Sequence, residues 1–593
     1  MKERRRHPGC GAGVGSPAAA RPATRAGLSG PGAVADPAAP DGDRSGAASP
    51  AGPRAGDPAA SAARGAGSPP RGEPAEGPSR HLAASSAVAG SSPKGWILAA
   101  LMLAMFMAAI EGTIVATAIP SIVADLGGFS RFSWVISAFM LTSAASVPIY
   151  GKLADLFGRK PVFLAGAGLF LLGSALCGTA ATIEQLVAFR ALQGLGAGAV
   201  QPITMTIVGD LYRLEERARV QGYLSSVWGI SAVVGPAAGG LLVQYAGWPW
   251  VFYINLPIGL LAMAGIALFL HEPPRHGRVS VDLAGSLWMV VAVSALLVQL
   301  VEGGSAWPWL SGTTAALLAV SLAAGWLFVR QERRAPDPLL PLELLGRPVI
   351  RAGNLGGLVG GVVLIGLSST VPTFVQGVLG HAPVVAGFAV ATLSIGWPLA
   401  SSLSGRLMLR WGFRGTATAG SLFGVAGVAV LLLADAGASP WQVAAGCFLV
   451  GVSMGLTMTT YIVSIQESVP RHERGVATGS QAFARMLGSA VGAALLGGVI
   501  NARLEGALMQ AGHPELARLG ADAGNWLLDA SRRATLDPAA LAALRQALAD
   551  AFHAAMAVVM LLALGVLPIV RSLPRSVEPA GAAPVDAGEA GGA

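Results

Sequence analysis

Glu111 is an acidic residue inside an otherwise apolar stretch of the chain, residues 96–119. A charged side chain within membrane hydrocarbon costs roughly 3 kcal/mol or more and is rare unless it has a function. Hydrocarbon disfavours the charged form of a carboxylate, so such a group can trade a proton against a cationic ligand. We therefore expect Glu111 to exchange protons, and a carboxylate that is paired only for structural reasons is the alternative.

Two arginines are the matching cations within apolar stretches. Arg190 lies in the stretch 185–208, and Arg485 lies in the stretch 475–500. An intramembrane cation usually faces a cavity or a partner, which predicts a role in coupling for both residues. Each lies toward one end of its stretch, so a side chain that reaches the membrane interface is the alternative.

A short polar joint at residues 151–160 carries Gly151, Asp155, Gly158 and Arg159. Its two glycines permit a tight turn. The aspartate beside basic residues forms a charge cluster that can hold neighbouring helices together in one state and release them in another. We predict a cytoplasmic gate at this joint, and an ordinary basic turn is the alternative.

A cluster of small residues and proline lies in the stretch 220–243, with Gly235, Pro236, Gly239 and Gly240. Proline interrupts the backbone hydrogen bonds of a helix, and small residues let helices approach closely. The cluster predicts a hinge, and close packing without a directional role is the alternative.

Other chemistries lack a recognisable pattern in this sequence. The 3 cysteines are too few and too scattered for a disulfide framework or a zinc site. The 8 histidines form no HExxH pattern, and no Walker A sequence is present. We therefore expect no enzymatic activity, no metal and no cofactor, and any pumping by this chain must run on a gradient of an ion or a solute and not on ATP.

The elements that must position these residues are long apolar helices. From Trp96 onward, apolar runs alternate with short polar joints, and a helix of about 20 such residues crosses the roughly 30 Å of membrane hydrocarbon. Asp537 followed by Pro538 predicts the capped start of a helix that leads into the last span. Roughly fourteen spans are expected, at residues 96–119, 133–150, 162–181, 185–208, 220–243, 251–270, 284–301, 312–330, 350–373, 384–404, 416–434, 441–464, 475–500 and 551–571.

Composition and charge also place the chain in a membrane. Of 593 residues, 53% are hydrophobic and 12% are charged, whereas soluble domains contain about 25% charged residues. A net charge of +8 would suggest nucleic acid as the partner of a soluble protein. With the N-terminus inside, however, the short inside segments hold about twenty Lys and Arg, and the short outside joints hold Arg131 alone. The positive-inside rule therefore predicts a multi-pass protein of the cytoplasmic membrane with both termini in the cytoplasm and no nucleic-acid partner.

The chain has low-complexity ends and an internal repeat. Residues 1–94 contain almost no large apolar residues and are expected to be disordered, as are residues 573–593. The Gly-x-Leu-x4-Gly spacing of the 151–160 joint recurs at residues 405–412 without the aspartate. An internal repeat half a chain apart is typical of transporters.

Five motifs together resemble one family, the major facilitator superfamily, in its fourteen-span drug:proton antiporter branch of the EmrB/QacA type. The resemblance covers residues 96–500 and, more weakly, the last span. Residues 111–115 resemble the span-one motif, with Glu111 where aspartate is usual. The other four are similar to the superfamily's loop motif, a span-four motif linked to proton coupling, an exporter motif of span five and a string at the start of span six, at residues 151–160, 190–196, 229–240 and 250–259.

This resemblance implies an all-α membrane protein with the major facilitator fold. Residues 95–271 and 349–572 are implied to form two six-helix bundles, the second with a long outer loop at 501–550. The linker 272–348 is implied to hold two extra central helices. The substrate site is implied to lie between the bundles at mid-membrane and to open alternately to each side.

The resemblance further implies a secondary active transporter that exports amphipathic, cationic, drug-like compounds in exchange for protons, and hence multidrug efflux and antibiotic resistance. Its partners would be a small-molecule substrate, protons and the lipid bilayer, and the sequence leaves open whether a periplasmic adaptor protein takes part. A dedicated exporter of an endogenous metabolite or lipid is a second hypothesis. A non-transporting receptor or scaffold on the same fold is a third.

Overall fold

Helices make up almost all of the part of the chain that the structure describes. The computed structural model describes residues 94–127, 132–272, 281–304, 306–512, 516, 526–527 and 533–575. The segments that were expected to be disordered, 1–94 and 573–593, lie almost entirely outside the described residues. All described helices belong to one unit, His81–Ala593.

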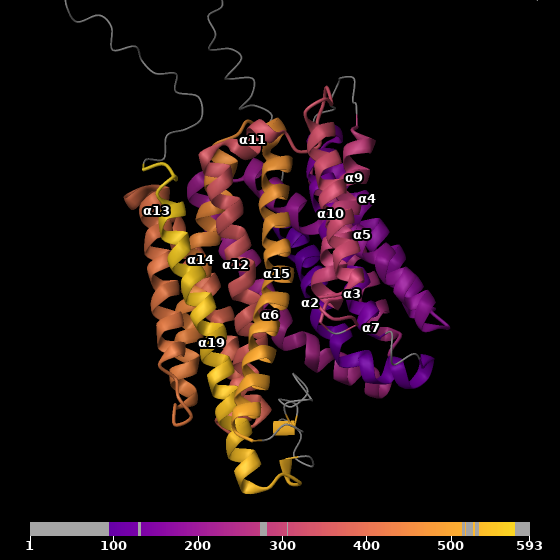
Figure 1. Cartoon of the computed structure of the whole chain (residues 1–593). Coiled ribbons are helices and arrows are strands. Elements are labelled where there is room, and N and C mark those ends of the chain that lie inside the picture. The colour runs from indigo at the N-terminus through magenta and orange to yellow at the C-terminus, as the bar shows by residue number, and fades with distance from the viewer. Residues whose placement is uncertain are drawn as a thin grey trace, which may run out of the picture. The chain divides into compact units, whose positions relative to one another are not determined.

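The first bundle is drawn from indigo to magenta in Figure 1. Its helices are α2 (Lys94–Leu126), α3 (Phe132–Phe157), α4 (Arg159–Gly178), α5 (Ile183–Leu211), α6 (Leu214–Tyr245), α7 (Trp250–Tyr253) and α8 (Asn255–Phe269). Two long helices, α9 (Leu283–Glu302) and α10 (Gly312–Glu332), and the short α11 (Leu342–Gly346) follow it.

The second bundle contains the orange and yellow helices of Figure 1. Its elements are α12 (Pro348–Thr373), the π-helix η2 (Phe374–Val378), α13 (Pro383–Leu432), α14 (Pro440–Glu467), the 3-10 turn η3 (Arg471–Glu473), α15 (Arg474–Gln510) and α19 (Pro538–Val570). Together with α9 and α10, the two bundles confirm the predicted all-α architecture.

The number of membrane-spanning helices agrees with the sequence expectation once two helices are considered. Within the described residues, 12 helices are long and apolar enough to cross a membrane. One of them, the 50-residue α13, contains two expected spans, because Gly412 adopts non-helical angles (φ 70°, ψ 178°) and turns the chain back. The helix α5 is a further expected span and is not among the 12, since Arg190, Gln193 and Gln201 make it more polar. The described helices therefore correspond to the fourteen predicted stretches.

Polar side chains just before the helices define where several spans begin. The Oγ1 atom of Thr182 accepts a hydrogen bond from the backbone N–H of Gln185 at the start of α5 (3.3 Å). Asp537 accepts one from Ala540 at the start of α19 (3.1 Å), and Pro538 follows it at the first helical position. Such caps satisfy N–H groups that have no partner within the helix. The predicted capped start of the last helix is confirmed.

Glycines allow the helices of the first bundle to touch backbone to backbone. A Cβ atom on Gly173 of α4 would lie 2.6 Å from the backbone nitrogen of Gln193 on α5. A Cβ atom on Gly196 would lie 2.6 Å from the carbonyl oxygen of Gly166. Small residues permit this approach, and it brings the polar face of α5 against α4.

The extra helix α9 contacts both bundles. Ala144 and Ala145 of α3, Met289 and Val293 of α9, and Val476 of α15 belong to one buried apolar cluster. Figure 1 shows α10 beside α9, and the two helices are in contact. The inserted pair therefore packs at the side of the interface between α3 and α15.

Candidate functional site

Glu111 and Arg190 form a buried ion pair between α2 and α5. The guanidinium NH1 group of Arg190 faces the carboxylate Oε1 atom of Glu111. The side chain of Glu111 is 0% exposed and that of Arg190 is 2% exposed. The two residues are far apart in sequence, and the packing of their helices brings the two intramembrane charges together. A buried carboxylate and a buried guanidinium neutralise each other's charge in this position.

Arg190 has further partners that hold its guanidinium in place. Its Nε atom donates to the carbonyl oxygen of Val135 (2.9 Å), and NH1 donates to Oε1 of Gln193 (2.7 Å). The guanidinium also lies 4.2 Å from the centre of the Phe139 ring, within the range of a cation–π contact. The structure therefore places Arg190 inside the bundle, and its side chain does not reach the membrane interface.

Three uncharged polar residues complete this cluster, and the sequence interpretation did not single them out. The Nδ2 group of Asn255, at the start of α8, donates to Oε2 of Glu111 (2.5 Å) and to Oγ of Ser174 (3.0 Å). Gln193 Nε2 donates to the same Ser174 hydroxyl (3.2 Å). We call Glu111, Arg190, Asn255, Gln193 and Ser174 the intramembrane network. The signal in the sequence that could have identified these three residues is that each is a polar residue within an apolar stretch.

Proline explains the position of Asn255. Pro257 has no N–H group, so the carbonyl of Tyr253 loses its helical partner and α7 ends there. The next helix begins at Asn255, whose side chain is fully buried. This break sets the amide at the depth of Glu111.

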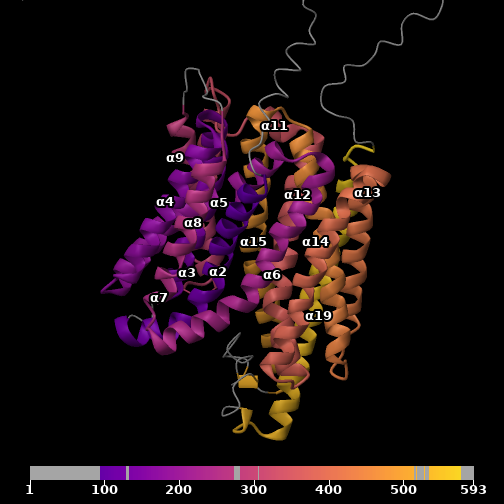
Figure 2. The same ribbon diagram turned by 180° about the vertical axis from the view of Figure 1, so that it is seen from behind.

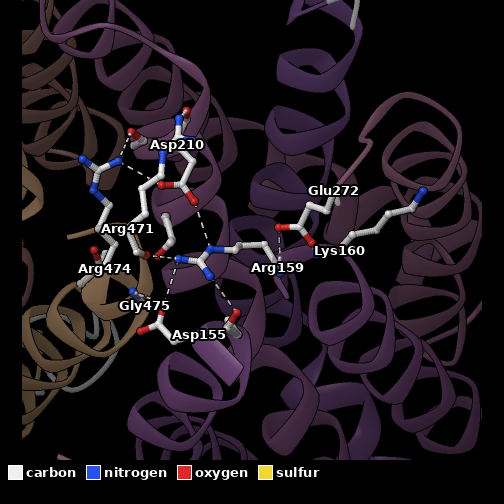
Figure 3. Close-up of polar contacts among 12 residues, drawn as sticks. Asp155, Arg159, Lys160, Asp210, Glu272, Arg471, Arg474 and Gly475 are labelled. Atoms are coloured by element: carbon white, nitrogen blue, oxygen red, sulfur yellow. Dashed lines mark hydrogen bonds and ion pairs between the residues drawn. The ribbon is translucent and has the colours of Figure 1, made fainter. Parts of the chain in front are cut away.

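Asp155 joins the two bundles at the end of α3. Its Oδ1 atom accepts a hydrogen bond from the backbone N–H of Gly475 (2.9 Å), and Oδ2 accepts one from Val476 (2.7 Å). Both N–H groups belong to the first turn of α15, where the helix dipole and the unpaired donors favour a negative charge. Figure 3 shows Asp155 beside Gly475. The aspartate thus caps a helix of the opposite bundle.

Arg159 links Asp155 to a second carboxylate. Its NH2 group lies 2.8 Å from Oδ1 of Asp155, and its Nε atom lies 3.0 Å from Oδ2 of Asp210 at the end of α5. Asp210 in turn pairs with Arg474 (3.0 Å). Figure 3 shows the Arg159 guanidinium between these two acids. We call Asp155, Arg159, Asp210, Arg474 and the first turn of α15 the latch.

Glu272 binds the backbone next to the latch, at the start of α4. Its carboxylate accepts hydrogen bonds from the backbone N–H groups of Arg159 (3.0 Å) and Lys160 (2.9 Å), at the first turn of α4. Gly158, which precedes them, has φ 100°, a conformation that favours glycine. Asp210 and Glu272 were not predicted, because acidic residues at the ends of spans usually lie on the solvated surface.

The latch closes with direct backbone contact. A Cβ atom on Gly151 of α3 would lie 2.7 Å from the carbonyl oxygen of Gly475, and one on Gly479 would lie 3.4 Å from the Cα atom of Gly151. In both views α15 lies beside α3 (Figures 1 and 2). Glycine at these positions lets the two bundles meet without an intervening side chain.

The second copy of the loop motif makes a different contact. Gly412 has φ 70°, close to the conformation of Gly158 at the matching position, which supports the internal repeat. Near this turn, the Nε atom of Arg414 donates to the carbonyl oxygen of Leu573 (2.9 Å). The copy without the aspartate therefore holds the segment after α19, while α13 also packs against α6 of the first bundle.

The glycine and proline cluster of α6 packs with one face only. Gly235 and Gly239 are buried against α2, where a Cβ atom on Gly239 would lie 3.1 Å from the carbonyl oxygen of Ile114. Pro236 and Gly240 are exposed, and a Cβ atom on Gly240 would meet nothing within 4 Å. The helix continues from Leu214 to Tyr245 across the proline.

Adjacent glycines in this cluster offer a matched test. We expect Gly239→Ala to reduce transport by at least about tenfold, because the added methyl group forces α6 away from α2. Gly240→Ala adds the same methyl group in open space, so transport should stay within about twofold. Efflux of a fluorescent substrate from cells with equal protein levels would measure both. Equal effects of the two substitutions would contradict this packing role.

Arg485 lies apart from both clusters. Its NH2 group donates to Oε1 of Gln201 on α5 (2.7 Å), across the interface between the bundles. The structure therefore joins the predicted residues in two groups, Glu111 with Arg190 and Asp155 with Arg159, and leaves Arg485 by itself.

Comparison with known proteins identifies the family. Residues 101–493 match the Major Facilitator Superfamily. The chain belongs to this superfamily. The Major Facilitator Superfamily consists of membrane transporters rather than enzymes, and its members bind small-molecule substrates. The chain is accordingly a multi-pass membrane protein of the transporter class.

Relatives within the superfamily include proteins named for multidrug transport and multidrug resistance. The chain is 36% identical over 401 residues to "Multidrug transporter protein MdtP" of Bacillus subtilis (strain 168), covering 68% of this chain and 74% of that one. It is 35% identical over 400 residues to "Multidrug resistance protein 3" of the same strain, covering 67% and 78%. The crystal structure of the human organic anion transporter MFSD10 (TETRAN) has a TM-score of 0.55 at 14% identity, covering 81% of this chain and 99% of that one. This structural similarity concerns the fold.

Proposed function

We propose that the protein is a proton-driven exporter of amphipathic, drug-like compounds. The observation that carries this proposal is the intramembrane network, in which a fully buried carboxylate and a fully buried guanidinium face each other. Such residues are costly within a membrane and are usually functional. The relatives named as multidrug transporters support the choice of substrate.

Protonation of Glu111 is the proposed switch. The ionised carboxylate pairs with Arg190 and accepts from Asn255. When Glu111 takes up a proton, the ion pair is lost, while Arg190 keeps Val135 and Gln193 as partners. The Asn255 amide can donate to the carboxylate and, after rotation about its last bond, accept from the protonated acid. The network can thus exist in two protonation states.

In the proposed mechanism, opening and closing of the latch is the conformational change that accompanies proton exchange. The positive-inside prediction places the latch on the cytoplasmic side, so the structure corresponds to a state that is closed to the cytoplasm. Opening toward the cytoplasm requires α3 to separate from the first turn of α15. Exchange of the proton on Glu111 and release of the latch then alternate in the transport cycle.

The preference for cationic compounds stays a prediction. This prediction assumed that Glu111 binds a cationic ligand. In the structure, however, the carboxylate of Glu111 already has Arg190 as its counter-ion and is 0% exposed. A cation reaches Glu111 only if Arg190 moves away. We therefore base the proposal on proton exchange and not on the charge of the substrate.

Transport in proteoliposomes tests the proposal. With an acidic interior, we expect the full chain to accumulate several unrelated amphipathic compounds, and each added compound should release protons from the vesicles. Accumulation of a single compound from a broad panel would favour a dedicated exporter. Absence of gradient-dependent flux for every compound would favour the receptor or scaffold and contradict the proposal.

A further inference from the structure

Arg485 is a cation deep within the second bundle. It lies on α15, about 15 Å along the helix axis from Gly475 at the latch, at 1.5 Å per residue. This distance is about half of the roughly 30 Å thickness of membrane hydrocarbon. The charge therefore lies well away from the membrane surface on the latch side.

The partner of Arg485 is neutral. Its guanidinium donates a hydrogen bond to the amide oxygen of Gln201 (2.7 Å), and the ion pairs of the described residues do not include it. By contrast, Arg159, Arg190 and Arg474 each face a carboxylate. A cation at this depth normally has a counter-ion. Arg485 lacks one among the described residues.

Glu111 does not serve as that counter-ion. Its two carboxylate oxygens face Arg190 and Asn255. Arg190 and Gln201 lie on the same helix, about 16 Å apart along its axis. The intramembrane network is therefore neutral by itself, and no described carboxylate compensates the charge on Arg485.

The Arg485 site is not fully buried, and it offers two kinds of donor. Both Arg485 and Gln201 are partly exposed, unlike the fully buried Glu111. A guanidinium has further N–H groups beyond the one that Gln201 accepts, and the amide of Gln201 has two N–H donors. Converging N–H donors around a cation match the two oxygens of a carboxylate.

We propose that Arg485 and Gln201 form a carboxylate-binding subsite between the bundles, so that the substrates are amphipathic compounds with an acidic group. This inference rests on the proposed export function, and it is the opposite of the cationic preference predicted from the sequence. The ligand's carboxylate supplies the counter-ion that Arg485 lacks among the residues that the structure describes. Arg485 is then a specificity-determining residue.

Binding of matched pyrene probes tests the charge preference without requiring transport. The probes are 1-pyrenebutyrate, its neutral amide and 1-pyrenemethylammonium, titrated by pyrene fluorescence against the purified full chain in detergent. We expect the butyrate to bind at least about tenfold more tightly than the other two, since hydrogen bonds to a charged group are the stronger ones. Equal binding of the three probes, or preference for the cation, would overturn the inference.

Three substitutions separate a ligand site from a structural bridge. Arg485→Gln should weaken butyrate binding at least about tenfold, while Arg485→Lys, which keeps the charge but loses the planar set of donors, should weaken it less. Gln201→Glu places a carboxylate beside the intact cation, so it should weaken butyrate binding as much as Arg485→Gln. Under a purely structural role the same substitution strengthens the bridge between the bundles and leaves the butyrate affinity unchanged, which would overturn the inference.

Failure of the export proposal gives a different result. Loss of proton-driven flux for all compounds, with butyrate still bound tightly and lost in Arg485→Gln, would refute export and leave the carboxylate subsite in place. Proton-driven flux of cationic probes alone, unaffected by Arg485→Gln, would leave export in place and refute the subsite.

Discussion

Glu111→Gln is expected to abolish proton-coupled transport, with a loss of at least about a hundredfold in gradient-driven uptake. Glutamine keeps the size of the side chain and an oxygen for Asn255 Nδ2, but it cannot take up or release a proton. Exchange of labelled for unlabelled substrate, which needs no net proton movement, should continue. Comparison of these two assays in proteoliposomes isolates the coupling step from binding.

The same substitution leaves Arg190 buried without its counter-ion. Removing one partner of a buried pair costs about 3–5 kcal/mol, so Glu111→Gln alone could reduce the amount of folded protein. The double variant Glu111→Gln with Arg190→Gln removes both charges and should recover thermal stability. Glu111→Asp is the control that keeps an acid. If the stable double variant still released protons when substrate is added, Glu111 would not be the coupling residue.

Helix positions in this protein follow closely from hydropathy, but helix ends do not. The predicted spans 475–500 and 551–571 lie within longer helices, α15 to Gln510 and α19 from Pro538. Hydropathy marks only the part of a helix that matches membrane hydrocarbon. The Ala-rich segments beyond it continue as helix because of their own propensity.

The charged site residues were predictable one at a time, but their partners were not. Glu111 and Arg190 each stood out as a charge in an apolar stretch, whereas their pairing depends on how α2 packs against α5. Asp155 stood out in its turn, but its partners are backbone N–H groups of α15. Every helix has such groups at its start, so they leave no mark in the sequence.

For the small residues of the α6 cluster, too, the packing partners could not be predicted from the sequence. Gly235 and Gly239 are four positions apart and share one face of the helix, which packs against α2. Pro236 and Gly240 belong to the exposed face. The sequence motif does not distinguish the four residues from one another. Only the position of the neighbouring helix shows which of them are packed and which are exposed.

Asp155→Asn is expected to open the latch. The substitution removes the charge that caps α15 and pairs with Arg159, and it turns an NH2 group toward the N–H donors of Gly475 and Val476. Hydrogen bonds to a charged group contribute about 2 kcal/mol, and this loss shifts the ratio of closed to open states roughly thirtyfold. We expect transport to fall at least about tenfold, because the closed state is then too rarely populated.

Spin labels on either side of the latch measure this shift. Phe157 at the end of α3 and His472 within η3 are exposed, and cysteines in their place can carry labels after the native cysteines are replaced. Asp155→Asn should move the distance distribution toward longer separations. Asp337→Asn is the matched control, because Asp337 pairs with Lys152 at the same end (2.5 Å) but is 37% exposed. Because Asp337 is in contact with solvent, its ion pair is screened and should contribute little, so this control should keep the distances of the unaltered protein. If Asp155→Asn kept them too, the closed state would depend on the backbone contact of Gly151 with Gly475 and not on the carboxylate.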